Sequence, residues 1–147
     1  MKVGIIGCGN ISNTYFNCSH IFNNIEIIAC ADIDKTASYK SAEKYNLKAQ
    51  SVEEILSNNE VELIVNLTIP SAHKEIISKC IASGKHCFSE KPLAMKFNEG
   101  YELKKFANEK NVFVGCAPDT FLGASGQKAR ELIDHNKIGN IYLGTFN

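Results

Sequence analysis

The chain opens with a short apolar run that leads directly into closely spaced glycines, and this feature constrains the fold more than any other. The run Lys2–Ile6 predicts a buried strand, and Gly7 and Gly9 follow it at once. Gly7 permits a tight turn out of the strand, and Gly9 lets the backbone approach a phosphate because it has no Cβ. A helix that begins near Asn10 then directs unpaired N–H groups at an anion. The arrangement is typical of a loop that binds the pyrophosphate of a dinucleotide.

The third glycine of the usual G-x-G-x-x-G pattern is replaced by Ser12, which is small enough for a helix to pack closely on the strand. The pattern alone leaves two interpretations open. One is a cofactor loop in which Gly7, Gly9, Asn10 and Ile11 bind a dinucleotide. The other is a glycine-rich strand–helix turn that binds no ligand.

Strand-like and helix-like segments alternate along the rest of the sequence. Further strands are expected at residues 25–31, 48–49, 61–67, 86–89 and 112–116. Helices are expected at residues 11–22, 35–45, 51–56, 72–82 and 98–109. This alternation predicts an α/β fold in which a doubly wound parallel sheet has the strand order 3-2-1-4-5-6. A ligand would bind at the carboxyl ends of strands 1 and 4.

Several helix ends have recognisable signals. Asp34 is placed to cap the helix at 35–45, and Asn46 ends it. Ser51 and Glu54 have the spacing of a capping box. Gly84 follows the helix at 72–82, as a C-terminal cap often does.

The last segment of the chain departs from the alternating pattern. Residues 119–126 predict a loop, 127–136 a helix and 141–146 a strand that has no evident partner. We therefore expect a dinucleotide-binding Rossmann domain over residues 1–122. Residues 123–147 would form a connector helix and the first strand of a truncated second domain. An unpaired strand edge and apolar faces in this tail favour self-association, as a dimer or a swapped assembly.

Composition excludes several classes of protein. The 147 residues include 16 Lys and Arg against 16 Asp and Glu, so no basic surface for nucleic acid or membrane is expected. No apolar run approaches the roughly 18 residues of a membrane span, and the first strand leaves no room for a signal peptide. The six cysteines lack the spacing of metal ligands and are interpreted as reduced, mostly buried thiols. We expect a cytoplasmic protein without a metal site.

An acidic residue ends the second predicted strand. Asp32 comes about 20 residues after the glycines, where a carboxylate accepts hydrogen bonds from the hydroxyls of the adenine ribose. It would repel the 2′-phosphate of NADP, and Arg130 is the only arginine of the chain. The position favours NAD over NADP, although the nearby Lys35 keeps NADP open. The alternative is that Asp32 only caps a loop.

Four motifs together resemble the Gfo/Idh/MocA oxidoreductases, the group of glucose–fructose oxidoreductase and inositol dehydrogenase. They are Gly4–Ile11, Ala31–Asp34, Thr68–His73 and Glu90–Pro92, and they match in order and spacing over nearly the whole chain. The Glu-Lys-Pro sequence after the fifth strand is the most specific of the four.

The resemblance implies roles for individual residues. Thr68 and Pro70 would line the edge of the nicotinamide half of the cofactor, and His73 would lie near the nicotinamide ribose or the helix start beside it. Glu90 and Lys91 would lie under the nicotinamide, where Lys91 is the catalytic residue that assists proton transfer at the reacting hydroxyl. An ammonium there would stabilise the negative charge that develops on the substrate oxygen.

The sequence departs from the family at two positions that bear on the substrate. Ser71 stands where the family often has Asn, and Asp119-Thr120 stands where many members have an Asn- and Arg-containing stretch.

The resemblance implies an NAD-binding domain whose parent enzyme moves hydride between nicotinamide and a secondary alcohol of a sugar, cyclitol or polyol. By itself the chain would turn over little or nothing. The alternative is a non-catalytic Rossmann module that senses NAD(H) or another nucleotide.

Overall fold

The computed structural model describes residues 1–117 and 120–145. Contacts divide the chain into two compact units, residues 1–117 and 118–147, and each unit is described by itself. The predicted boundary after residue 122 between a cofactor domain and a connector stays a prediction, because compactness does not define the domains of a parent protein.

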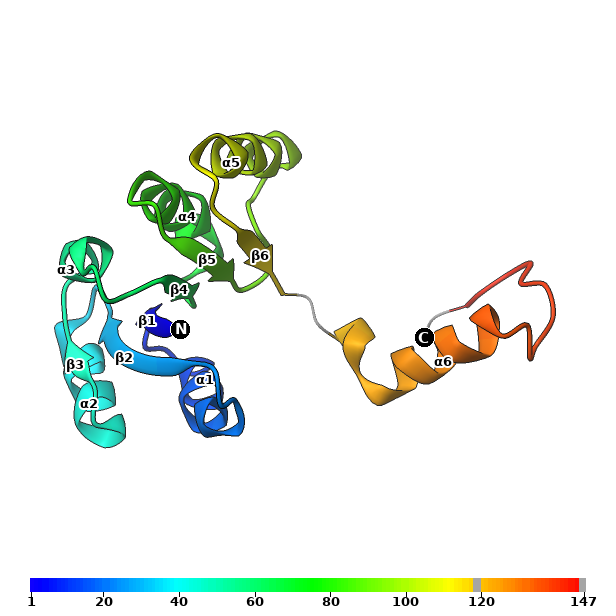
Figure 1. The fold of residues 1–147 in the computed structure, drawn as a ribbon, viewed down its shortest axis with the longest axis horizontal. Helices are drawn as coiled ribbons and strands as arrows, with labels where there is room; N and C mark the ends of the chain where they lie inside the picture. The colour runs from blue at the N-terminus through cyan, green and yellow to red at the C-terminus, as the bar shows by residue number, and fades with distance from the viewer. Residues whose placement is uncertain (118–119, 146–147) are drawn as a thin grey trace. The chain divides into compact units, whose positions relative to one another are not determined.

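The first unit is built on a parallel sheet of six strands (Figure 1). The strands are β1 (Lys2–Ile6), β2 (Glu26–Ala31), β3 (Lys48–Ala49), β4 (Leu63–Asn66), β5 (His86–Ser89) and β6 (Val114–Cys116). Their order is β3-β2-β1-β4-β5-β6, which confirms the predicted doubly wound topology. The order reverses beside β1, so the loops after β1 and β4 lie at the point where such sheets bind ligands.

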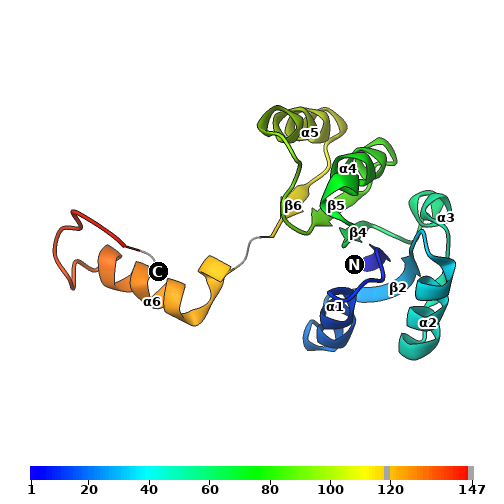
Figure 2. The ribbon, with the colours of Figure 1, turned by 180° about the vertical axis from the view of Figure 1, so that it is seen from behind.

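Helices cover both faces of this sheet (Figures 1 and 2). They are α1 (Ser12–Cys18), α2 (Lys35–Tyr45), α3 (Val52–Ser57), α4 (His73–Ala82) and α5 (Phe97–Lys110). Phe16 of α1 and Ala42 of α2 join one buried cluster. Ile55 of α3, Ile77 of α4 and Leu103 of α5 join the other. Apolar strands covered on both faces are the expected form of a parallel sheet.

The predicted caps form as expected. The Asp34 side chain accepts a hydrogen bond from the N–H of Thr36, and Asn46 ends α2 in the left-handed conformation at φ +54°. Ser51 and Glu54 make a complete capping box at the start of α3. Gly84 has φ +71° directly after the C-cap of α4. Side-chain caps satisfy backbone N–H groups that a helix leaves unpaired, and this fixes where the helices begin.

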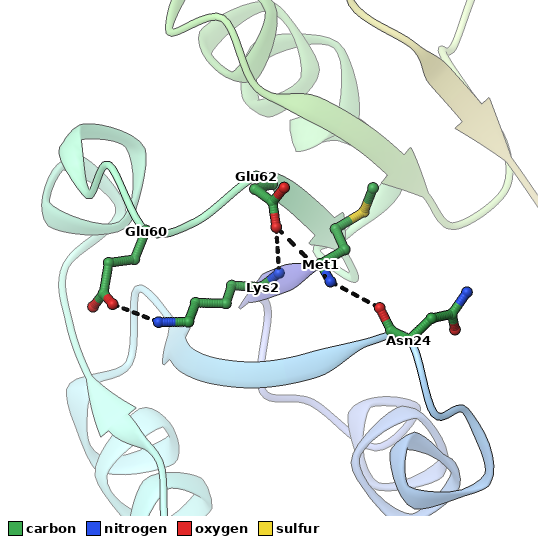
Figure 3. Close-up of polar contacts among 5 residues, drawn as sticks. All are labelled: Met1, Lys2, Asn24, Glu60 and Glu62. Carbon is green, nitrogen blue, oxygen red and sulfur yellow. Dashed lines mark hydrogen bonds and ion pairs between the residues drawn. The ribbon is translucent and has the colours of Figure 1, made fainter.

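Polar contacts hold the start of β1 at the amino end of the sheet (Figure 3). The N-terminal ammonium donates to the carbonyl of Asn24 at 2.8 Å, and the N–H of Lys2 donates to Glu62 at 2.7 Å. The Lys2 ammonium pairs with Glu60, which raises the pKa of Lys2 and lowers that of Glu60. All these groups are exposed, so the contacts add little stability and mainly set the register of the strand.

The first helix is shorter than predicted. The expected helix over residues 11–22 ends at Cys18 and continues as a single 3₁₀ turn, Ser19–Ile21. The hydroxyl of Ser19 donates to the carbonyl of Phe16 at 2.8 Å. A serine that bonds back to the preceding turn competes with the α-helical pattern, which accounts for the early end.

The second unit corrects two expectations. The α6 helix (Ala124–Asp134) begins inside the segment predicted as a loop, after a 3₁₀ turn at Thr120–Leu122. The strand predicted at 141–146 is wrong, because residues 141–145 form no strand. A strand needs a neighbour to take up its backbone hydrogen bonds, and residues 120–145 offer none. Phe146 and Asp119 lie outside the described residues.

Within the part of the chain that the structure describes, no helix is long and apolar enough to cross a membrane. The same residues contain no group of three or more His, Cys, Asp or Glu side chains that could hold a metal ion.

Candidate functional site

Gly7 fixes the path of the loop that leaves β1. Its φ is +104°, a conformation that residues with a side chain rarely adopt. A Cβ at this position would lie 2.6 Å from the carbonyl carbon of Leu67, in the loop that follows β4. The N–H of Gly7 donates to the carbonyl of Ala31 at 2.8 Å. Gly7 therefore brings the ends of β1, β2 and β4 together, and the protein itself requires glycine there.

Gly9 differs from Gly7 because nothing in the chain requires it to be glycine. Its φ lies outside the left-handed region, and among residues 1–117 and 120–145 no atom beyond its chain neighbours lies within 4 Å of the place where a Cβ would be. The hydroxyl of Ser12 donates to the carbonyl of Gly9 at 2.6 Å and holds the loop from inside. Gly9, Asn10 and Ile11 are exposed. The loop thus presents bare backbone to the space outside the sheet.

Asp32 lies against the glycine loop, and its two side-chain contacts, both to backbone N–H groups, also fit the alternative that it caps a loop. One carboxylate oxygen accepts the N–H of Cys8 at 2.6 Å, and the other accepts the N–H of Asp34 at 2.8 Å. A carboxylate can accept about four hydrogen bonds, so Asp32 keeps acceptor capacity for a ligand. Because both contacts are to backbone, the position of the carboxylate is fixed by the main chain of the loop.

Cys8, between the two loop glycines, lies beside the buried Cys30. A hydrogen bond between the two thiols lowers the pKa of Cys8, against burial and the charge of Asp32, which raise it. The same contact and burial raise the pKa of Cys30. Cys8 is half-buried, whereas Cys30 is fully buried.

A buried polar network supports the loops that follow β4 and β5. Asn66 and Ser89 end these neighbouring strands, lie opposite each other in the sheet and are fully buried. The Asn66 amide donates to the Ser89 hydroxyl at 3.1 Å, while its oxygen accepts the hydroxyl of Thr68 at 2.7 Å. The backbone carbonyl of Asn66 also accepts the N–H of Glu90 at 2.9 Å. Asn66 thus holds both Thr68 and Glu90.

The Glu90–Lys91–Pro92 turn brings its charged groups to the same edge of the sheet. The carboxylate of Glu90 accepts the hydroxyl of Tyr15 at 2.8 Å and the N–H of Lys91 at 3.1 Å. Lys91 is exposed, and within residues 1–117 and 120–145 its ammonium has no hydrogen-bond or ion-pair partner. Cys116 lies beside this turn, and burial, followed by the charge of Glu90, raises the pKa of its thiol.

His73 lies at a helix start, one of the two places that the resemblance implies, and its side chain is buried. It begins α4 and is fully buried. Its Nδ1 lies 2.6 Å from the carbonyl oxygen of Pro92, and its Nε2 lies 2.9 Å from that of Thr68. In this structure the ring joins the two loops and has no free edge. A direct contact of His73 with a cofactor stays a prediction that this burial does not favour.

The structure gathers the predicted residues at one edge of the sheet. Gly7, Asp32, Thr68 and Glu90 directly follow or lie just beyond the carboxyl ends of β1, β2, β4 and β5. Pro70 is exposed at the start of the 3₁₀ turn Pro70–Ala72. Their roles toward a cofactor stay predictions.

Three residues of this edge were not predicted from the sequence: Tyr15, Asn66 and Ser89. Polar residues at the ends of apolar strands are the signal that points to Asn66 and Ser89. Tyr15 has no such signal, because it reads as one member of the apolar face of a helix.

Comparison with known proteins shows the family to which this chain belongs. The model of the Gfo/Idh/MocA family, described as an oxidoreductase family with an NAD-binding Rossmann fold, matches residues 1–117. The chain belongs to this family. It comprises the NAD-binding Rossmann part of a Gfo/Idh/MocA oxidoreductase, as its motifs predicted.

One curated relative and two solved structures are similar to the chain over most of its length. A trans-1,2-dihydrobenzene-1,2-diol dehydrogenase of Xenopus tropicalis is 28% identical over 95% of this chain and 44% of its own length. The WlbA dehydrogenase of Bordetella pertussis, solved with NADH and UDP-GlcNAcA, superposes with a TM-score of 0.90 at 22% identity, over 97% of this chain and 42% of its own. Biliverdin reductase of Synechocystis sp. PCC 6803, solved with biliverdin and NADP⁺, superposes with a TM-score of 0.82 at 24% identity. The match covers 96% of this chain and 44% of the reductase.

The chain spans about 40% of the length of the curated relatives it matches. The two structures, at under 25% identity, show the fold alone.

Proposed function

We propose that this chain binds NAD(H) at the carboxyl edge of its sheet, as the cofactor part of a dehydrogenase. The carrying observation is the contact between Asp32 and the N–H of Cys8 at 2.6 Å. Asp32 is expected to bind the adenine ribose, and the loop that contains Cys8 is expected to bind the pyrophosphate. The hydrogen bond joins these two parts of the site. In a Rossmann site these two groups of a dinucleotide are adjacent, so they need adjacent partners.

The residues present fit such a cofactor. Gly9 is a glycine that the fold does not require, with open space where its Cβ would be. A ligand that approaches the backbone closely would account for it. Asp32 retains acceptor capacity beyond its two backbone contacts.

We further propose NAD rather than NADP as the preferred cofactor. A ribose diol donates two hydrogen bonds to a carboxylate, whereas a 2′-phosphate places a second negative charge beside Asp32. The residues after Asp32 are Ile33, which is fully exposed, and Asp34, which caps α2. No arginine lies in this segment to balance a phosphate, and Lys35 is the only cation near in sequence.

The parent enzyme would use Lys91 for proton transfer. When bound, the nicotinamide accepts or donates hydride at C4, and the reacting alcohol must lose or gain a proton in the same reaction. The ammonium of Lys91 is free of protein partners among the described residues. It can donate a proton to the substrate oxygen during reduction, and its neutral amine can accept that proton during oxidation. Glu90 and Asn66 hold the turn that carries it.

The proposed substrate class is a secondary alcohol on a sugar, cyclitol or similar polyol. The relatives named above include a dehydrogenase of a diol and a dehydrogenase solved with UDP-GlcNAcA, and both ligands carry secondary hydroxyls. Biliverdin reductase shows that the same fold also serves other chemistry.

The proposal includes a cytoplasmic location and self-association through residues 118–147. All six cysteines are free in the structure, which is typical of reducing compartments. The association is argued below from the apolar residues of the second unit.

Titration calorimetry of the purified chain with NADH and NADPH tests the proposal. We expect tighter binding of NADH, and about ten- to a hundred-fold weaker binding by Asp32→Ala because a charge-assisted hydrogen bond is lost. Asp34→Asn is the matched control. Asn caps a helix as well as Asp does, so this variant keeps α2 and should bind NADH as the parent chain does.

Two results would contradict the proposal. Equal NADH affinity in Asp32→Ala and the parent chain would remove Asp32 from the site. Absence of binding of either dinucleotide by the folded parent chain would exclude a cofactor site complete within these residues.

A further inference from the structure

Tyr15 reaches from the first helix to the turn that carries Lys91. It lies on α1, and its hydroxyl donates to one carboxylate oxygen of Glu90 at 2.8 Å. The other oxygen of Glu90 accepts the N–H of Lys91 at 3.1 Å. The carboxylate thus connects the tyrosine hydroxyl to the backbone of Lys91.

This contact crosses the point where the cofactor site is expected. α1 follows β1 and the Glu90 turn follows β5, and β4 lies between these strands in the sheet. The Tyr15–Glu90 hydrogen bond therefore joins the helix that follows the loop after β1 to the turn after β5, on either side of the end of β4. The loop after β1 carries the glycines, and the turn after β5 carries Lys91.

The backbone of the turn is already held at both ends. The N–H of Glu90 donates to the carbonyl of Asn66, and the carbonyl of Pro92 lies 2.6 Å from the ring of the buried His73. These contacts leave the side chains of Glu90 and Lys91 free to rotate. Tyr15 holds the side chain of Glu90. The hydrogen bond between them is strong, because a half-buried hydroxyl donates to a charged carboxylate.

We propose that Tyr15 is a positioning residue for the nicotinamide half of the site. It rests on the proposed function, because Glu90 and Lys91 bear on the nicotinamide only if the chain binds NAD(H). The tyrosine orients the Glu90 carboxylate, and that carboxylate fixes the backbone N–H of Lys91. Tyr15 acts through Glu90 and makes no contact with the reacting atoms.

Tyr15→Phe tests the proposal, because it removes one hydroxyl and keeps the ring. Tyr45→Phe is the matched control. The Tyr45 hydroxyl also bonds α1, through Asn13 at 2.9 Å, but it is not bonded to the Glu90 turn. Each variant is titrated with NADH and with ADP-ribose, which has the adenine half and the pyrophosphate but no nicotinamide. Exchange of the Lys91 amide proton is measured by NMR without ligand.

We expect Tyr15→Phe to weaken NADH binding about three- to tenfold and to leave ADP-ribose binding unchanged. The Lys91 amide should exchange faster in Tyr15→Phe than in the parent chain or in Tyr45→Phe. A general loss of structure would weaken both ligands together, so the ratio of the two affinities separates positioning from folding.

Two outcomes would overturn the proposal. One is a ratio of NADH to ADP-ribose affinity that is the same in Tyr15→Phe and Tyr45→Phe. The other is unchanged exchange of the Lys91 amide. If the parent chain binds neither ligand, the proposed function fails, and the exchange of Lys91 by itself then decides whether Tyr15 orients the turn.

Discussion

Two glycines in one loop have different physical reasons for being glycine. Gly7 has φ +104°, and its backbone passes so close to Leu67 that a Cβ would overlap the main chain. Gly9 has neither constraint. The stability of the chain therefore depends on the first glycine, and the second is left for whatever approaches the loop from outside.

Substituting each glycine by alanine should separate these roles. Gly7→Ala should lower the free energy of unfolding by about 2 kcal/mol or more, since the strained backbone and the overlap act together. Gly9→Ala should leave that free energy unchanged but weaken NADH binding about tenfold or more. Urea unfolding and calorimetric titration measure the two effects. A Gly9→Ala variant that binds NADH as tightly as the parent chain would mean that nothing approaches the loop there.

For individual residues, the sequence predicts a place in the site where the role of the residue depends on local spacing. The glycines and Asp32 are such residues, and the structure places them together. Tyr15 could not be found this way, because its hydroxyl bonds a partner from a distant segment. His73 shows the same limit, since a motif gives its position but not its burial between two carbonyl oxygens.

Secondary-structure elements were predictable where their ends have side-chain signals. The bounds of α2 (Lys35–Tyr45) match because Asp34 caps its start and Asn46 its end. The strand expected at 141–146 failed for the opposite reason. Alternating apolar residues show only that a segment suits a sheet, and a strand exists only with a neighbour.

The capping box of α3 offers a test at this scale. Ser51→Ala removes the hydroxyl that accepts the N–H of Glu54 at 3.1 Å, so the free energy of unfolding should fall by about 1 kcal/mol. Ser57→Ala is the control, because its hydroxyl donates to a carbonyl and caps no N–H group. Urea unfolding compares the two variants. Equal losses would show that the cap does not stabilise α3.

Glu54 adds a dependence on pH to this box. The N–H and the hydroxyl of Ser51 lower the pKa of Glu54 below the ordinary value of a glutamate. A lowered folded-state pKa stabilises the fold above the unfolded value, and this stabilisation is lost as the pH falls through the folded one. Glu54→Gln should therefore be less stable than the parent chain at neutral pH, with the gap closing in acid. A gap that stays constant from neutral to acidic pH would contradict the assignment.

The whole molecule consists of two units with unequal means of burying apolar surface. Residues 1–117 contain two buried clusters, one on each face of the sheet, and coincide with the part that the family model matches. The described residues 120–145 contribute no buried side chain, and Tyr142 and Leu143 are 91% and 84% exposed. The first unit therefore has the buried apolar core that independent folding requires. The described part of the second unit exposes most of its apolar side chains to solvent.

This difference predicts that the chain self-associates through its second unit. Sedimentation velocity should show assemblies of the 147-residue chain that grow with concentration, while residues 1–117 stay monomeric and unfold at the same temperature as the full chain. Substituting Tyr142 and Leu143 together by Ser should weaken association, because removing exposed apolar area lowers the gain from burying it. Phe113→Ser is the matched control, since Phe113 is 80% exposed but lies in the first unit. A full chain that stays monomeric over a wide range of concentrations, or a Phe113→Ser effect as large as that of the tail variant, would place the association elsewhere or exclude it.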